Sequence, residues 1–398
     1  MIHPVSKKIV IDVSHEVRSF LIGCVPTGVL RVSLAYIEHY KHDAQALYCT
    51  SKKGYLLSRE QSECLFSEIL NSGSKQVVES LIKPPIIRQF LAKCYPPQPV
   101  SGFLLNMSYF GLDKPWYFNM LSSLALRPLF FVHDLIPMTH PEYCIDASKN
   151  RHVTRMDRIL EKSSAAICNS LTTLNALTHY ASQSNRHLLP CVVAPLASAV
   201  ALSTPGKRRL EQPYFVMLGT IEPRKNHAFL LQIWRDLVPQ LGEATPRLII
   251  IGQRGWKYEQ VANLLEYSPL LKGKVIELSN CSDKELITYL HHAQALLFPS
   301  FVEGYGLPLV ESLALNVPVI ASDISVFREV AGDIPDYVHP LDGKRWAELI
   351  LAYTDAHSAD RQAQLCRMKK NFKPPTWVEH FKKVDHFLDE LMVDHSEM

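Results

Sequence analysis

Residues 298–311 read Phe298-Pro-Ser-Phe-Val-Glu-Gly-Tyr-Gly-Leu-Pro-Leu-Val-Glu311, with glutamates at positions 303 and 311. The apolar run at 293–298 predicts a short buried strand. Gly304 and Gly306 predict a loop after this strand, and Pro308 suits the first turn of a helix. We therefore expect one carboxylate in the loop at the carboxyl end of a strand and the other in the first turns of the helix.

This pair of glutamates suits a ligand that carries both hydroxyls and phosphates. Glycine lets a ligand approach the backbone closely, and the free N–H groups at a helix start favour an anion. Ionised carboxylates accept hydrogen bonds from hydroxyls. Either glutamate alone would fit an ordinary surface charge, but the two in this setting indicate a nucleotide-sugar site.

A second motif lies about 80 residues earlier in the chain. The run at 213–219 predicts a strand that ends on Gly219, and Thr220-Ile-Glu-Pro-Arg-Lys-Asn226 predicts a turn before a helical pattern. Arg224 and Lys225 therefore sit where a loop enters its helix, and both can reach an anion held at the helix terminus.

Together the two motifs resemble glycosyltransferase family 4, whose members are retaining enzymes of the GT-B fold. The resemblance is specific over 213–332 and looser over the first 200 residues, where it includes the loop 26–32. The turn at 221–227 is most similar to mannosyltransferases of bacterial surface-polysaccharide assembly.

Three positions depart from the family pattern. Thr220 stands where many members carry arginine, so Arg224 is expected to serve the phosphates together with Lys225. Asn316 replaces a glycine in a turn, and asparagine is the non-glycine residue that best tolerates a positive φ. Leu30 replaces a second glycine in the N-terminal loop that keeps Gly28.

The resemblance implies roles for individual residues. Glu311 would bind the ribose hydroxyls of the donor, Glu303 the hydroxyls of the donor sugar, and Arg224 with Lys225 the diphosphate whose charge develops as it leaves. The expected nucleotide-sugar site also contains Gly28, Gly219, Thr220, Gly304, Tyr305, Gly306 and Leu307.

His133 is the candidate catalytic residue of the N-terminal half. It ends the expected strand 128–133, at a carboxyl end that should face the cleft, where histidine can hydrogen-bond a sugar hydroxyl or the leaving phosphate. The family has a similar histidine here. Asp134 would either orient the ring or cap the turn, and Ser170 would start a helix as its N-cap.

The sequence contains no Asp-x-Asp motif of the kind that holds a metal in many transferases. We therefore expect no metal and no cofactor. Protein cations and backbone N–H groups would stabilise the leaving group instead.

Composition is that of a globular protein with two domains. The chain has 398 residues, of which 47% are hydrophobic and 20% charged. A formal net charge of +3 argues against a dedicated nucleic-acid binder. Nine scattered cysteines, the lack of a signal peptide and the lack of a long apolar run predict a cytoplasmic chain, which would meet a lipid-linked acceptor at the membrane surface.

Apolar strands alternate with helical patterns throughout, which is typical of parallel α/β architecture. A polar break at 199–212 predicts a linker. We expect two doubly wound Rossmann-like domains facing across a cleft, at 1–200 and 201–375, with a final helix in 376–398 packing back on the first. The expected strands are 8–13, 101–107, 128–133, 165–169, 187–196, 214–218, 247–251, 274–278, 295–298 and 318–321, with helices at 28–40 and within 51–98.

The sequence thus predicts a retaining, metal-independent hexosyltransferase. GDP-mannose is the first donor to consider and a UDP-hexose the second, with a saccharide or lipid-linked acceptor. A sugar-nucleotide 2-epimerase shares the GT-B fold but would need acid and base residues near the donor sugar, which the sequence does not suggest. A catalytically silent, saccharide-binding partner subunit remains the alternative outside the enzymes.

Overall fold

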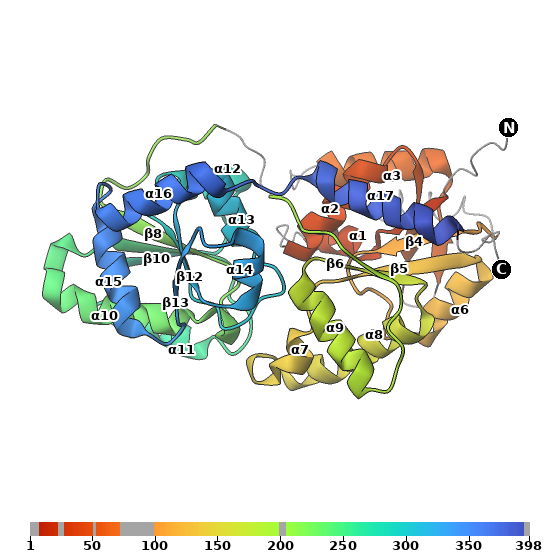
Figure 1. The fold of residues 1–398 in the computed structure, drawn as a ribbon, viewed down its shortest axis with the longest axis horizontal. Coiled ribbons are helices and arrows are strands. Elements are labelled where there is room, and N and C mark those ends of the chain that lie inside the picture. Colours follow the sequence, from red (N-terminus) through yellow and green to blue (C-terminus); the bar gives the residue numbers. More distant parts are fainter. Residues whose placement is uncertain (1–7, 23–27, 51–52, 72–98, 199–203, 394–398) are drawn as a thin grey trace.

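The computed structural model describes residues 8–22, 28–50, 53–71, 99–198 and 204–393. These residues form two α/β domains, each built on one sheet covered by helices (Figure 1). The fold class expected from the sequence is confirmed in this respect. The expected loop residues 26 and 27 and the expected segment 72–98 lie outside the described residues.

The first sheet has the strand order β3-β2-β1-β4-β5-β6-β7. All neighbours pair in parallel except β2 and β3, which are antiparallel. Its strands are β1 Ile9–Asp12, β2 Ala44–Cys49, β3 Gly54–Leu56, β4 Gly102–Asn106, β5 Leu126–Val132, β6 Ala165–Cys168 and β7 Cys191–Val193. Its helices are α1 Ser14–Leu21, α2 Gly28–Tyr40, α3 Arg59–Asn71, α6 Pro115–Ser123, α7 Ile136–Thr139, α8 Asp146–Lys162 and α9 Leu171–Gln183.

The second sheet has the strand order β10-β9-β8-β11-β12-β13, and its described pairs are parallel. Its strands are β8 Tyr214–Leu218, β9 Arg247–Ile251, β10 Val275–Leu278, β11 Leu296–Phe298, β12 Val319–Ser322 and β13 Asp336–Val338. Its helices are α10 His227–Leu241, α11 Glu259–Tyr267, α12 Asp283–His291, α13 Leu307–Ala314, α14 Ser325–Ala331, α15 Gly343–Thr354 and α16 Ala359–Asn371.

The central strands are mainly apolar because helices cover both faces of each sheet. In β5, the residues from Pro128 to Val132 are all buried. Helix starts follow local signals: Ser282 and Glu285 form a complete capping box at the start of α12. Apolar runs and helix caps are both visible in the sequence, which explains why most strands of the two sheets were predicted.

Three strands were not predicted. β3 and β13 are three-residue strands at the sheet edges, and five of their six residues are partly exposed, so they lack a continuous buried run. β2 mixes buried and half-buried positions directly after α2. The mixed segment expected to be helical contains α3 but also begins with the short strand β3.

The chain returns to the first domain through α17, Trp377–Val393, which lies over that domain in Figure 1. His380 fixes this helix: its Nδ1 lies 3.0 Å from the Pro195 carbonyl oxygen and its Nε2 lies 2.9 Å from the Tyr36 hydroxyl. Phe381 packs against Tyr36 with ring centroids 5.0 Å apart. Among the described helices, none combines the length and apolar character that a membrane span requires.

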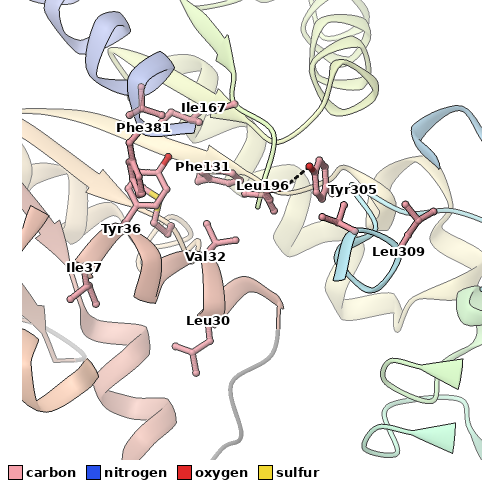
Figure 2. Close-up of a cluster of buried hydrophobic side chains, with 14 of the residues drawn as sticks. Leu30, Val32, Tyr36, Ile37, Phe131, Ile167, Leu196, Tyr305, Leu309 and Phe381 are labelled. Atoms are coloured by element: carbon pink, nitrogen blue, oxygen red, sulfur yellow. Dashed lines mark hydrogen bonds between the residues drawn. The ribbon is translucent and has the colours of Figure 1, made fainter. Parts of the chain in front are cut away.

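The apolar core continues from one domain to the other (Figure 2). Tyr36 and Phe131 of the first domain belong to the same cluster of buried side chains as Tyr305 and Leu309 of the second. The Tyr305 hydroxyl donates a hydrogen bond to the Leu196 carbonyl oxygen, at 2.6 Å. The two domains are therefore joined by packed side chains.

Candidate active site

A cavity of about 560 Å³ lies between the two domains. The first domain contributes His133 and Asp134, which directly follow β5. The second contributes the residues that follow β8, β9 and β11. Ligands of doubly wound sheets collect outside the carboxyl ends of the strands, and here two such edges face one cavity. The lining residues from the sequence-based site are Gly28, His133, Gly219, Thr220, Arg224, Lys225, Glu303, Gly304, Tyr305, Gly306, Leu307 and Glu311.

The loop from β11 to α13 depends on its two glycines for different reasons. Gly306 has φ of 104°, and a Cβ there would lie 2.8 Å from the Phe327 ring. Gly304 meets the first domain: a Cβ would lie 2.2 Å from the His133 carbonyl oxygen. α13 then begins at Leu307, with Pro308 in its first turn as expected.

Glu303 is the centre of a buried ion cluster. Its Oε2 lies 2.6 Å from Arg224 Nη1, and its Oε1 lies 2.5 Å from Lys225 Nζ. The Ser300 hydroxyl donates a further bond to Oε1 at 2.8 Å. Burial opposes ionisation of this carboxyl, but the charges of Arg224 and Lys225 outweigh it and lower the pKa of Glu303 to about 2.

Glu222 is a fourth charged member of this cluster, and sequence reasoning missed it. Its Oε1 lies 2.6 Å from Arg224 Nη2, and only 3% of the residue is exposed. Burial raises the pKa of Glu222, while Arg224 opposes that shift. The signal was present in the sequence, because Glu222 lies in the same turn as Arg224 and Lys225.

The cation pair expected to bind phosphates is thus held by carboxylates in this structure. Burial lowers the pKa of Lys225, and the charge of Glu303 opposes this effect. For Arg224 the effect of burial is outweighed, and the nearby Glu303 and Glu222 raise its pKa. Both side chains line the cavity, so an incoming anion would meet them there.

Glu311 lies in the second turn of α13, where it is 4% exposed and lines the cavity. Gly219 directly follows β8 and has φ of 142°, and its N–H donates to the Ile251 carbonyl oxygen at 2.9 Å. A Cβ on Gly219 would lie 3.2 Å from Lys225 Cε. Glycine at this position therefore leaves room for the Lys225 side chain to cross the loop.

His133 lines the cavity, but its ring is largely buried at 8% exposure. Nε2 lies 2.6 Å from the Met107 carbonyl oxygen, and the ring packs against Phe131 with centroids 4.6 Å apart. Burial lowers the pKa of His133, which favours the neutral ring. Because a carbonyl can only accept, Nε2 carries the proton and donates, which leaves Nδ1 as an acceptor.

Asp134 caps the turn after β5 and does not orient the His133 ring. Its Oδ1 accepts a hydrogen bond from the Ile136 N–H at 2.9 Å. Ser170 is the N-cap of α9 as expected, because its hydroxyl oxygen accepts from the Thr173 N–H at 3.0 Å. Asn316 has φ of 60°, so the turn without its glycine keeps the positive φ that the sequence predicted.

The N-terminal loop residues lie at the cavity rim. Gly28 begins α2, and a Cβ on it would make an ordinary contact of 3.5 Å with Leu307. Arg31, one turn further on, forms an ion pair with Asp283 of the second domain, with Nη1 3.2 Å from Oδ2. Leu30 is buried. Within the described part of the chain, no group of three or more His, Cys, Asp or Glu side chains is arranged to hold a metal ion.

Two parallel-sheet domains with a cavity between their carboxyl edges define a GT-B protein. Two solved structures show the same fold over nearly the whole chain. Anabaena Alr3699/HepE in complex with UDP-glucose aligns with a TM-score of 0.62 at 12% identity, covering 98% of this chain and 100% of that one. Sucrose-phosphate synthase from Thermosynechococcus elongatus gives a TM-score of 0.63 at 14% identity, with 98% and 100% coverage.

Residues 203–350 match the family model described as glycosyl transferases group 1. The matched region contains Arg224, Lys225, Glu303 and Glu311 but not His133.

Curated relatives match over similar lengths. The chain is 30% identical over 222 residues to the serotype-specific mannosyltransferase WbdA of Escherichia coli, covering 51% of this chain and 26% of WbdA. It is 28% identical over 222 residues to the O-antigen chain mannosyltransferase RfbU of Salmonella typhimurium, covering 55% and 58%. The chain therefore spans about a quarter of WbdA and under two thirds of RfbU.

Proposed function

We propose that this protein transfers a hexose from a nucleotide-sugar to a saccharide or lipid-linked acceptor, with retention at the sugar carbon and without a metal ion. The buried cluster of Arg224, Lys225 and Glu303 in the cavity between the domains carries this proposal. It combines cations for a diphosphate with a carboxylate for sugar hydroxyls.

Mannose from GDP-mannose is the first donor that we propose. The names of the relatives support it, because WbdA, RfbU and the Escherichia coli O-antigen chain mannosyltransferase B are all called mannosyltransferases. A UDP-hexose is the second candidate, since the solved HepE complex of the same fold contains UDP-glucose.

The donor diphosphate would bind against Arg224 and Lys225, where it competes with the Glu303 carboxylate for the same two cations. Glu222 would keep Arg224 in place as Glu303 turns toward the sugar hydroxyls. As the bond from the sugar to the diphosphate breaks, the cations stabilise the charge that develops on the leaving oxygen. Nδ1 of neutral His133 would accept a hydrogen bond from a sugar hydroxyl. The Glu311 carboxylate would accept hydrogen bonds from the ribose hydroxyls.

The acceptor would enter from the first domain, opposite the donor. We place the protein on the cytoplasmic side of the membrane, where a lipid-linked acceptor would be reached by contact with the membrane surface. Nucleotide-sugar and acceptor are its proposed partners, and nucleic acid is not among them.

The first test is stabilisation of the purified protein by GDP, UDP, GDP-mannose and UDP-glucose, followed by a transfer assay with EDTA present. A ligand at 100 times its Kd stabilises the folded state by about 2.7 kcal/mol, which a thermal shift detects. We expect one nucleotide class to stabilise and the matching sugar to be transferred with retention in EDTA. Binding without transfer would favour the silent partner subunit, and activity only with added Mg²⁺ or Mn²⁺ would refute the metal-free mechanism.

A further inference from the structure

The start of α9 in the first domain is hydrogen-bonded to the loop that follows Glu303 in the second. The Ser170 hydroxyl lies 2.9 Å from the Gly304 carbonyl oxygen, and the Thr173 hydroxyl lies 3.2 Å from the same atom. Both hydroxyl residues are buried. A carbonyl oxygen has two lone pairs and can accept from both, so a single backbone atom next to Glu303 receives two bonds from the opposite domain.

The two domains also leave no space for a side chain at residue 304. A Cβ there would lie 2.2 Å from the His133 carbonyl oxygen and 2.9 Å from Asp134 Cβ. The Asn169 side-chain amide donates to that His133 oxygen at 2.9 Å, which fixes it in position. The peptide after Glu303 is therefore packed directly against the backbone of the first domain.

Contacts on both sides of Gly304 support the same arrangement. Tyr305 is 5% exposed and donates from its hydroxyl to Leu196, as Figure 2 shows. On α14, the Glu329 carboxylate accepts from the Leu171 N–H at 2.6 Å and the Thr172 N–H at 3.0 Å, and so joins the second domain to the first turn of α9. The contact region between the domains thus includes Leu196 of the first domain and α14 of the second.

We infer that Ser170 and Thr173 are positioning residues, which hold the Glu303–Gly304 loop in its working place when the cleft is closed. The inference rests on the proposed role of Glu303 at the donor sugar. Glu303 bonds through its side chain to cations of its own domain, and the backbone beside it bonds to the other domain. Closure of the cleft therefore sets the position of this carboxylate, whereas the nucleotide contacts remain within the second domain.

Thr173→Val is the most informative variant. It removes the hydroxyl with little change of shape and keeps the helix cap, because the Ser170 oxygen can still accept from the N–H of residue 173. Thr173→Ser restores the hydroxyl. Thr178→Val is the matched control, since the hydroxyl of Thr178 bonds only within α9, to the Leu174 carbonyl oxygen at 2.9 Å. Ser170→Ala is less specific because it also removes the N-cap.

For Thr173→Val we expect kcat to fall by roughly 3- to 10-fold, as for the loss of one hydrogen bond, with the Kd for GDP (or UDP, if the wild type binds only UDP) within twofold of wild type. Thr173→Ser and Thr178→Val should both keep kcat within about twofold. Unchanged kcat in Thr173→Val, or a loss of nucleotide affinity as large as the loss of kcat, would overturn the inference.

Hydrogen exchange in the full chain gives a readout that does not need activity. With GDP or UDP bound, amides in 301–309 should exchange faster in Thr173→Val than in Thr178→Val. Equal exchange in the two variants would refute the positioning role. If the wild type transfers no sugar from any donor, the proposed function is wrong, and the exchange experiment still decides whether α9 orders this loop.

Discussion

Lys225→Ala tests the diphosphate assignment most directly. The Lys225 ammonium is 2.5 Å from Glu303, and the residue is 6% exposed, so it is a buried, pre-organised cation. Removal of one pre-organised stabilising donor costs about 2.7–4 kcal/mol of transition-state stabilisation, which corresponds to a fall in kcat of about 10²–10³-fold. Transfer by the purified variant at saturating donor measures this loss.

Two controls separate this effect from unfolding. Lys272→Ala removes an exposed lysine outside the cavity and should leave activity and stability unchanged. Lys225→Ala itself should stay folded, because Arg224 at 2.6 Å and Ser300 at 2.8 Å still satisfy the Glu303 carboxylate. Wild-type turnover in a folded Lys225→Ala protein would refute the assignment of these cations to the diphosphate.

Other predictions concern the two glutamates, His133 and a buried carboxyl. Glu311→Ala should mainly weaken nucleoside diphosphate binding, whereas Glu303→Ala should lower turnover more than affinity; titration of both variants checks this, and equal affinity losses would contradict it. His133→Ala should reduce kcat and kcat/KM in parallel, while nucleotide binding stays nearly intact. Wild-type turnover in this variant would leave His133 with a structural role. Burial raises the pKa of Glu16 to about 7 from 4.5. As pH rises, Glu16 therefore ionises first in the unfolded chain, and the free energy of unfolding of the wild type falls. Between pH 4 and 8 the free energy of unfolding of Glu16→Gln should rise relative to that of the wild type by up to about 3 kcal/mol, as measured by denaturation. A difference that does not change with pH would contradict the reasoning.

The sequence predicted those parts of the site that depend on local signals. The pattern of strand, glycine and helix start within one short segment predicted that Gly219 and Glu303 lie in loops after strands, as the structure shows. The tolerance of asparagine for a positive φ predicted the backbone conformation of Asn316. The position of His133 after β5 followed from the same kind of local pattern.

What the sequence could not predict are the contacts between distant segments. Glu303 and Arg224 are 79 residues apart, so their ion pair depends on how two loops meet at the edge of the sheet. The bond from His133 to the Met107 carbonyl oxygen depends on the loop after β4. The contacts of Gly304 with Ser170 and Thr173 depend on the relative placement of two domains, for which a sequence pattern contains no local signal.

The charges in the cluster explain why the two glutamates should behave differently when they are replaced. Arg224 and Lys225 are balanced in the buried cluster by Glu303 and Glu222, so the site holds two cations and two carboxylates close together. A diphosphate adds negative charge to this balance, and a buried charge without a partner is strongly unfavourable. In the proposed function, binding of the donor would therefore separate one carboxylate from the cations, and Glu303 would turn to the sugar. With these proposed roles, loss of Glu303 would remove a competitor of the diphosphate as well as a ligand of the sugar, which is why turnover should fall while nucleotide affinity is kept. Glu311 is buried in α13 and lines the cavity, and its proposed ribose contact lies away from the bond that breaks, so its loss should appear in binding.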